Sequence, residues 1–475
     1  MPRFSEYFSI DATQAELDFV DISTDYDTPV YVDPYAITIL EGEWAEQTSE
    51  IITGFFHSVI DNLRSGNERR AENLLSNLSE PKETFLGVSQ GSPKGRGVGH
   101  HQSASLIKAL RNSLAFSTGI LSDVSELALY VENFNRDKVS DLTTNIIREK
   151  LVEYTQEQCE LYEIDTEDYN GPPIWNGEKG RWEAKRIQLP HIDSTPILLV
   201  PKVIVRRTLS LDGPEFYKKN ITDFLVSENL SGQTALVETL KNGKMRVKKS
   251  DVREKHPYSK DFIAEIVGKY PELLDFYKNM KVHSGVLTNI QDDDPSTGKV
   301  ATLLAEKLQN TASGKKHAEQ YHGIIMHALN LCFYPHLTQP KREWEINDGR
   351  KRIDIAYTNS SNSGFFQERR QAHNTCSTIV IVECKNYSSD LENAEFDQLL
   401  GRFDDNKGKL GFLVCRNNEN RKLVLERAKD AAKSKRGYII LLEDADVIEM
   451  LRNVAVGQHE KNDEMLRLKF REIIS

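Results

Sequence analysis

The distribution of apolar residues divides this chain near residue 300. Beyond that point, short apolar runs of strand length alternate with segments whose apolar residues recur at helical spacing. Asn347, Asp348 and Gly349 predict a tight hairpin between the first two strands. Strands that alternate with helices predict a mixed α/β sheet flanked by helices on both faces. The strands are predicted at residues 344–346, 352–357, 379–385, 410–415 and 438–442, and the helices at 299–308, 315–331, 391–403, 421–434 and 446–452.

The first 290 residues show a less regular pattern. Five prolines between residues 172 and 201 interrupt helix formation, and acidic and turn-forming residues at 292–298 indicate a linker. We predict a mostly helical regulatory or assembly domain at 1–165, an α+β region at 166–290 that could be continuous with it, a linker at 291–300 and a C-terminal domain at 301–475. Helices are predicted at 51–63, 71–78, 103–114, 138–162 and 260–280, and strands at 19–22, 28–33, 197–200 and 203–205.

Composition narrows the classes of protein to consider. The 475 residues are 39% hydrophobic and 28% charged, with a net charge of −11, which is typical of a globular protein. No apolar run approaches the roughly 20 residues that span a bilayer, and the N-terminus lacks the apolar core of a signal peptide. We therefore expect a cytoplasmic protein without a membrane partner. Five cysteines without paired spacing argue against a zinc finger or a disulfide framework.

Two of the predicted strands carry acidic residues in apolar surroundings. Asp354 lies between two isoleucines, and Glu383 lies near the end of the run 379–385. Alternate side chains of a strand share a face, so Glu383 and Lys385 point the same way while Cys384 points the other way. Two carboxylates beside an ammonium group can bind a divalent ion and orient a water, as hydrolysis of a phosphodiester requires. Strand-end charges and a surface ion pair are the alternative interpretation.

These residues and the order of elements around them resemble the PD-(D/E)XK nuclease superfamily, and within it the Mrr-like restriction enzymes and related anti-phage nucleases. Ile353 stands where the superfamily signature has proline, and the 29 positions between Asp354 and Glu383 make a long interval. The resemblance implies a restriction-endonuclease-like fold and phosphodiester hydrolysis with Mg²⁺, which Mn²⁺ can replace. It covers roughly residues 299–451 and rests on Arg352-Ile353-Asp354, Glu383-Cys384-Lys385, and a following helix with Gln398 and Gly401-Arg402-Phe403.

The predicted site is wider than these three residues. Asp354, Glu383 and the backbone carbonyl of Cys384 are expected to hold the metal ion, and Lys385 to position the water and stabilise developing charge. The first-helix acid of the superfamily falls on Glu319, which either takes part or belongs to a solvated helix face. Gln398 is a further catalytic candidate, with a structural role as the alternative. Nucleic acid is expected to contact Arg402, Arg369, Arg370, Lys351 and Arg352.

The sequence thus predicts a metal-dependent DNA endonuclease whose N-terminal region senses substrate, assembles protomers or restrains cutting. Bacterial anti-phage or restriction-type defence, with a second defence subunit as an added partner, follows from analogy alone. A homo-oligomer, a dimer or higher, is expected because one site cuts one strand. The alternatives are a DNA repair or recombination nuclease such as a junction resolvase, and a nuclease-fold module that binds nucleic acid without cutting it. An exonuclease with an iron–sulfur cluster is disfavoured by the cysteine spacing.

Three weaker patterns lie outside the predicted site. The glycine-rich segment Gly87–Gly99 could wrap a phosphate at a helix N-terminus or be a surface loop. Asp21, Asp25, Asp27 and Asp33 form an acidic cluster that could be a second metal site, although turn-forming, solvated acids explain it well. A basic stretch could follow a phosphate backbone or be a solvated face; it comprises Arg206, Arg207, Lys218, Lys219, Lys241, Lys244, Arg246, Lys248 and Lys249.

Overall fold

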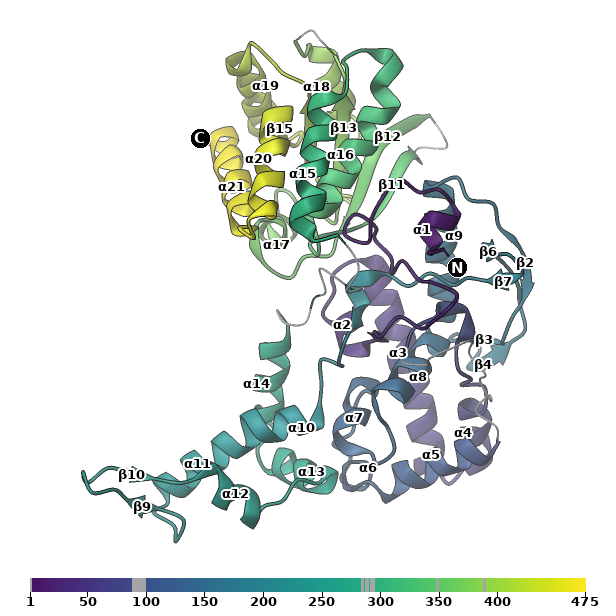
Figure 1. Ribbon diagram of the computed structural model, residues 1–475, viewed down its shortest axis with the longest axis vertical. Helices are drawn as coiled ribbons and strands as arrows, with labels where there is room; N and C mark the ends of the chain where they lie inside the picture. The colour runs from purple at the N-terminus through teal and green to yellow at the C-terminus, as the bar shows by residue number, and fades with distance from the viewer. Residues whose placement is uncertain are drawn as a thin grey trace.

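Two separate sets of buried apolar side chains form the cores of this protein. The first set runs from Phe4 to Ile290, and the second runs from Val300 to Ile473 and also contains Ala15. The computed structural model arranges the chain around these cores as two bodies along the long axis of the molecule (Figure 1). It describes residues 2–87, 100–282, 286, 290, 295–346, 350–387 and 390–475. The tip of the predicted hairpin at 347–349 and the segment 88–99 lie outside these residues.

The C-terminal body is built on a five-stranded mixed sheet, which confirms the predicted α/β class. The strand order is β11-β12-β13-β14-β15; the first two pairings are antiparallel and the last two are parallel. Hairpins can join antiparallel strands directly, whereas the parallel strands are joined through helices. The strands are β11 (Leu337–Ile346), β12 (Lys351–Asn359), β13 (Ile379–Lys385), β14 (Leu410–Cys415) and β15 (Tyr438–Glu443).

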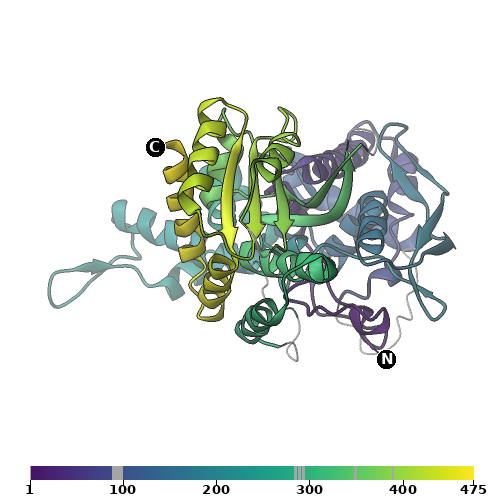
Figure 2. The same ribbon diagram turned by 90° about the horizontal axis from the view of Figure 1, so that it is seen from above.

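Two groups of helices pack against this sheet. In the first group, α15, α16 and α20 contact one another. In the second group, α19 contacts α21, while α17 packs against α21 and α18 packs against α19. Figure 2 shows the sheet from above with these helices around it. The helices are α15 (Thr297–Asn310), α16 (Ala318–Phe333), α17 (Gly364–Gln371), α18 (Asn393–Leu400), α19 (Arg421–Lys433), α20 (Asp444–Ala455) and α21 (Glu460–Ile474).

Strand β11 is longer than the sequence predicts. The apolar pattern indicates a strand only from residue 344, because Pro340 interrupts the run before it. Proline lacks a backbone N–H and is confined to edge strands or bulges. Both conditions hold here: β11 is an edge strand, and its register with β12 shifts between Thr338 and Lys341. The polar residues 358–377 between the second and third strands indicate a loop, but the structure has helix α17 within them.

The N-terminal body is mainly helical, and its described residues also form five two-stranded β-pairs and three isolated β-bridges. The predicted helix 138–162 is two helices that meet at Ile147, and the predicted helix 260–280 is interrupted at Tyr270 and Pro271. The helices are α1 (Phe4–Tyr7), α2 (Pro34–Thr38), α3 (Glu43–Arg64), α4 (Glu68–Leu75), α5 (His100–Asn112), α6 (Leu114–Thr118), α7 (Leu127–Tyr130), α8 (Arg136–Ile146), α9 (Arg148–Leu161), α10 (Gly213–Phe216), α11 (Thr222–Ser231), α12 (Lys249–Lys255), α13 (Lys260–Lys269) and α14 (Glu272–Lys281).

The strands predicted at 19–22 and 197–200 do not form a sheet. Both runs are buried, and they meet through a bridge at Phe19 and through the Val20 N–H, which donates to the Val200 carbonyl at 3.0 Å. The apolar pattern therefore predicts correctly that these residues are buried, but it does not predict that they lack regular strand pairing. The strands of this body are β1 (Tyr31–Val32), β2 (Glu167–Asn170), β3 (Ile174–Asn176), β4 (Arg181–Glu183), β5 (Arg186–Leu189), β6 (His191–Ile192), β7 (Thr195–Pro196), β8 (Val205–Arg206), β9 (Glu238–Thr239) and β10 (Met245–Arg246).

The two bodies are joined by buried hydrogen bonds. The Asp18 carboxylate accepts the Tyr154 hydroxyl at 2.8 Å and the backbone N–H of Gln339, in the β11 bulge, at 3.2 Å. The Asn330 side chain on α16 donates to the Glu16 carbonyl at 2.9 Å. Burial raises the pKa of the Asp18 carboxyl, which the Tyr154 bond partly opposes. The N-terminal segment is therefore fixed between α9 and the edge strand of the sheet.

Among the described residues, no helix combines the length and the apolar composition that crossing a membrane requires.

Asp141 on α8 should make the stability of this protein depend on pH. Burial, together with the nearby Glu80, Asp137 and Asp27 carboxylates, raises the Asp141 pKa from 3.8 to about 7. The stability this carboxyl contributes is complete below pH 3.8 and is lost as the pH rises through 7, because the unfolded state then releases the proton more readily. Asp141→Asn should therefore stabilise the protein at pH 8 by about 2 to 4 kcal/mol, and by much less at pH 5.

Thermal unfolding of the parent and Asp141→Asn at pH 5 and pH 8 measures this effect. Asp165→Asn is the matched control, because Asp165 is exposed. Equal differences in melting temperature at both pH values would contradict the assignment.

Candidate functional site

Strands β12 and β13 separate at Asp354. The last ladder pair on this side is Ile355 with Val382, and one position further the Asp354 carboxylate accepts the backbone N–H of Cys384 at 2.8 Å. A side-chain oxygen thus takes the place of a strand carbonyl, which fixes the Asp354 carboxylate between the two strands. The two acidic motifs of the sequence are therefore joined by a direct hydrogen bond.

Three potential metal ligands converge beside this bond. One ligand atom each from His322 on α16, Glu343 on β11 and Asp354 on β12 lies within 4.8 Å of the other two. Ligands about 2.1 Å from one octahedral ion are separated by about 3 Å when adjacent and about 4.2 Å when opposite, so the group is compatible with a single divalent ion. The three side chains are partly or fully exposed, so an ion can reach them from solvent.

The hairpin register brings Glu343 to Asp354. Arg342 pairs with Ile355 and Trp344 with Ile353, which places Glu343 opposite Asp354 across β11 and β12. Glu343 has a backbone φ of 47°, a left-handed conformation that is uncommon for a residue with a β-carbon. Helix α16 packs against β11 and β13 and adds His322 to the pair. The site therefore combines a local hairpin contact with a long-range helix contact.

Glu383 has a different environment from Asp354. Its side chain is 0% exposed, and one oxygen accepts the Lys385 ammonium at 2.7 Å while the other forms an ion pair with the Arg402 guanidinium. Lys385 also donates to the Gln398 side-chain oxygen at 3.3 Å. Burial lowers the Arg402 pKa, and the nearby Asp354 and Glu343 carboxylates oppose that effect. Glu383 is therefore held by two cations and lies outside the group of three ligands.

The structure places Glu319 and Arg402 differently from the sequence prediction. The Glu319 side chain is 76% exposed and forms an ion pair with Arg342, so it does not join the metal-ligand group. His322 lies three residues further along the same helix and joins that group instead. Arg402, which we expected at a nucleic-acid surface, is 6% exposed and partners Glu383.

The other predicted nucleic-acid contacts divide between the two ends of the sheet. Lys351 donates to the Gly401 carbonyl at 2.6 Å and Arg352 pairs with Glu345 at 2.8 Å, both close to the start of β12 and thus to Asp354. Arg369 and Arg370 lie on α17, which follows the far end of β12. The Arg369 guanidinium stacks over Phe470 at 4.3 Å, and Arg370 forms ion pairs with Glu41 and Glu46 of the N-terminal body. The structure therefore does not bring Arg369 or Arg370 to the site.

Sequence reasoning missed His322 and Glu343, although a signal existed for each. His322 is one helical turn from Glu319, so a helix that directs Glu319 toward the sheet also presents His322 nearby. Glu343 could have been found by counting outward from the Asp348-Gly349 turn, since antiparallel pairing about a hairpin fixes opposite residues. Which of Glu319 and His322 faces the site depends on how α16 is rotated about its axis, which the sequence does not specify.

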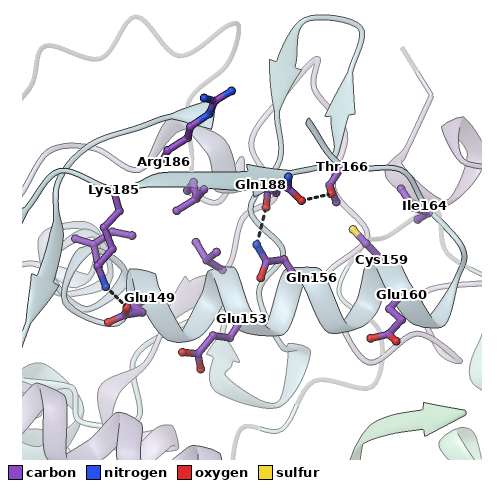
Figure 3. A pocket seen from close by; sticks show the side chains of 13 residues that line it. Glu149, Glu153, Gln156, Cys159, Glu160, Ile164, Thr166, Lys185, Arg186 and Gln188 are labelled. Carbon is purple, nitrogen blue, oxygen red and sulfur yellow. Dashed lines mark hydrogen bonds and ion pairs between the residues drawn. The ribbon is translucent and has the colours of Figure 1, made fainter. Parts of the chain in front are cut away.

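A hollow also lies in the N-terminal body, away from these residues. It has a volume of about 610 Å³ beside α9, and Figure 3 shows side chains that line it. Glu149 pairs with Lys185 there, and the Gln156 side chain donates to the Gln188 carbonyl at 3.1 Å. Cys159 also lines it, and burial raises the pKa of this thiol to about 12. Such a thiol stays protonated near neutral pH and is a poor nucleophile. None of the residues predicted to act on phosphodiesters lines this hollow.

A family model described as a domain of unknown function (DUF8370) matches residues 9–212. A comparison with curated proteins finds no significant match. Two solved structures of the restriction endonuclease FokI, one of them bound to DNA, share 11% and 12% sequence identity with this chain. Each alignment covers 92% of this chain, and it covers 80% and 81% of the respective FokI chains. Their TM-score of 0.25 is too low to establish a shared fold.

Proposed function

We propose that this protein is a divalent-metal-dependent nuclease that hydrolyses phosphodiester bonds of DNA. The observation that carries the proposal is the convergence of His322, Glu343 and Asp354 beside a hydrogen bond that ties Asp354 to the Glu383-Cys384-Lys385 strand. An imidazole and two carboxylates form a suitable ligand set for a divalent ion. Hydrolysis of a phosphodiester also needs a cation close to the reacting phosphate, and we propose that Lys385 is that cation.

The residues of this site have separable roles in the proposed reaction. A divalent ion supplies Lewis acidity and a water of lowered pKa when bound. Asp354 provides a carboxylate whose direction is fixed by the Cys384 N–H at 2.8 Å. Lys385 holds its ammonium 2.7 Å from Glu383, from which it can orient the attacking water and stabilise the charge that develops on the phosphate. Gln398 limits the rotation of Lys385 through its own contact.

The ligand set also bears on the identity of the metal. Mg²⁺ prefers oxygen ligands in near-ideal octahedral geometry, whereas imidazole nitrogen suits transition metals. With His322 beside two carboxylates, we propose that Mn²⁺ supports faster cleavage than Mg²⁺ at equal concentration. Removal of His322 should reduce that preference.

A cleavage panel tests the proposed function and the metal preference together. The full chain is incubated with supercoiled, linear and single-stranded DNA and with RNA, in EDTA, Mg²⁺ or Mn²⁺. We expect DNA cleavage that requires a metal ion, and His322→Gln should lower the Mn²⁺-supported rate by about tenfold or more and weaken Mn²⁺ binding in calorimetry. His373→Gln is the matched control, because His373 is an exposed histidine outside the site. Cleavage of none of these substrates in either metal would refute the proposal.

A second function is favoured by one observation. Both oxygens of Glu383 face cations, Lys385 and Arg402, which resembles a structural ion-pair cluster more than an open metal site. A nuclease-fold module that binds nucleic acid without cutting would have this feature. The same panel separates the two functions, since such a module would shift DNA in a gel with any metal and leave it intact.

Two finer features complete the proposal. We place the enzyme in anti-phage or restriction-type defence, with assembly into a homodimer or larger oligomer and a second defence subunit as candidate partners. Support comes from the N-terminal body, which packs against β11 and α17 through Asp18, Glu41 and Glu46 and is thus positioned to restrain or assemble the catalytic domain. Plasmid linearisation that rises with the square of protein concentration is the expected sign of dimeric cutting.

A further inference from the structure

Helices α10 to α14 and the hairpin β9–β10 form an arm that extends from the N-terminal body. In both views the hairpin projects away from the rest of the molecule, with α11 and α12 at its base (Figure 1, Figure 2). In its stem, Phe216 stacks on Tyr277 with ring centroids 4.7 Å apart, and Asn229 is buried. The arm is therefore a packed extension that ends in a solvated tip.

The tip of the arm is strongly basic although the whole chain carries a net charge of −11. Residues 238–255 contain seven cationic side chains and three acidic ones, an excess of four positive charges. Glu238 pairs with Arg246 and Lys248, and Asp223 pairs with Lys249. Lys241 and Lys244 are exposed and form no ion pair with any residue that the structure describes. At the turn of the hairpin, these two lysines are accessible to an external anion.

The turn of the hairpin holds these lysines in a defined conformation. The Leu240 N–H donates to the Lys244 carbonyl at 2.9 Å and closes the turn. The Lys244 N–H donates to the Asn242 side-chain oxygen at 3.1 Å. Gly243 has a φ of 79°, which a residue with a β-carbon adopts only at a cost. A turn whose backbone is fixed in this way loses little backbone freedom on binding, which reduces the entropic cost of contacting an anion.

We infer that this arm is a docking site for the phosphate backbone of double-stranded DNA. The charge of the tip is complementary to a polyanion, and a two-stranded ribbon has the width that the major groove of B-DNA admits. Met245, 52% exposed between Lys244 and Arg246, offers an apolar contact among the cations. Arg206, which the sequence placed in the same basic stretch, is buried and donates to the carbonyls of Val203 and Val205, so it does not belong to this surface.

The inference rests on the proposed function, because it takes DNA as the substrate, and it separates binding from cutting. The hairpin projects at one end of the long axis, whereas the C-terminal body with Asp354 occupies the other (Figure 1). One duplex must be long to meet both. The arm should therefore raise the affinity for long duplexes and leave the cutting of short ones unchanged.

Binding measurements on the full chain test the arm. Fluorescence anisotropy with duplexes of about 15 and about 60 base pairs, in EDTA and at several salt concentrations, gives both affinity and its salt dependence. Lys241→Gln/Lys244→Gln should weaken binding of the long duplex by about tenfold and reduce the slope of log K against log salt by about 1.8, at about 0.9 per lost phosphate contact. The matched control is Lys138→Gln/Lys461→Gln, since both lysines are exposed and lie outside the arm.

The results for the parent and the arm variant show separately whether the arm binds DNA and whether the protein cuts it. Unchanged affinity and slope in the arm variant would overturn the inference. An RNA of similar length, added as a further anisotropy probe, would overturn it if the loss were confined to RNA. Sedimentation of parent and variant would overturn it if self-association changed, because a second copy would then be the occupant. If the parent cuts DNA but the arm variant binds normally, only the arm inference fails. If the parent cuts nothing but the arm variant loses duplex binding, the inference stands and the proposed nuclease function fails.

Discussion

Asp354→Asn should reduce metal-dependent DNA cleavage by about a thousandfold while the protein remains folded. Asparagine retains an oxygen that can accept the Cys384 N–H, so the separation of β12 and β13 should persist. What it loses is the negative charge that Asp354 contributes to the ligand group with Glu343 and His322, on which metal affinity and charge stabilisation depend. The loss should therefore appear in two measurements, the single-turnover cleavage rate and the affinity for Mn²⁺ by calorimetry.

The control for this variant is Asp430→Asn on α19, where the aspartate is exposed and distant from the site in sequence. It should leave both measurements at parental values. Thermal unfolding of the two variants should agree within a few degrees, which shows that lost activity is not lost folding. If Asp354→Asn cuts DNA at the parental rate, Asp354 has no role in the reaction and the metal site must lie elsewhere.

Glu383→Ala should destabilise the C-terminal body by about 3 to 5 kcal/mol, in addition to removing activity. The substitution leaves the Arg402 and Lys385 cations in a buried site without their shared carboxylate, and an uncompensated buried charge has a cost of this size. From the sequence alone we would expect an alanine variant at this position to lose activity without unfolding. The structure changes that expectation because Glu383 is fully buried.

Calorimetric melting of the full chain measures the effect. A loss of 3 kcal/mol corresponds to a decrease of about 6 to 12 °C for a domain of this size. Glu383→Ala/Arg402→Leu should recover part of the loss, since it removes the stranded charge together with the carboxylate. Asp397→Ala is the control, because the Asp397–Arg436 pair is 64% and 55% exposed and should contribute less than about 1 kcal/mol.

A melting temperature of Glu383→Ala equal to that of the Asp397→Ala control would show that the buried pair contributes nothing to stability. Because of the expected destabilisation, Glu383→Gln is the better variant for activity. Glutamine preserves the volume of the side chain and one acceptor for Lys385 or Arg402.

The strands of the C-terminal domain could be predicted wherever the pattern was local. Residues 379–385, 410–415 and 438–442 are apolar runs of strand length, and all three are strands within a residue of the predicted bounds. The prediction was weakest at 337–343, because Pro340 and polar residues hide an edge strand that only its pairing with β12 defines. Helix α17 was missed because its apolar pair is buried by tertiary packing: Phe365 packs against Phe470 of α21, and Phe366 packs against Phe333 of α16 and Phe412 of β14.

For the candidate site, the sequence by itself determined the acids and the lysine in two strands, because alternation along a strand is a property of the backbone. It also determined that β11 and β12 form a hairpin, since turn residues act over a few positions. Only the tertiary structure decided that His322 rather than Glu319 approaches Asp354, that Arg402 partners Glu383, and that Arg370 faces the N-terminal body. These contacts join residues far apart in the chain, and their geometry depends on how whole helices pack against the sheet, which no local pattern of residues encodes.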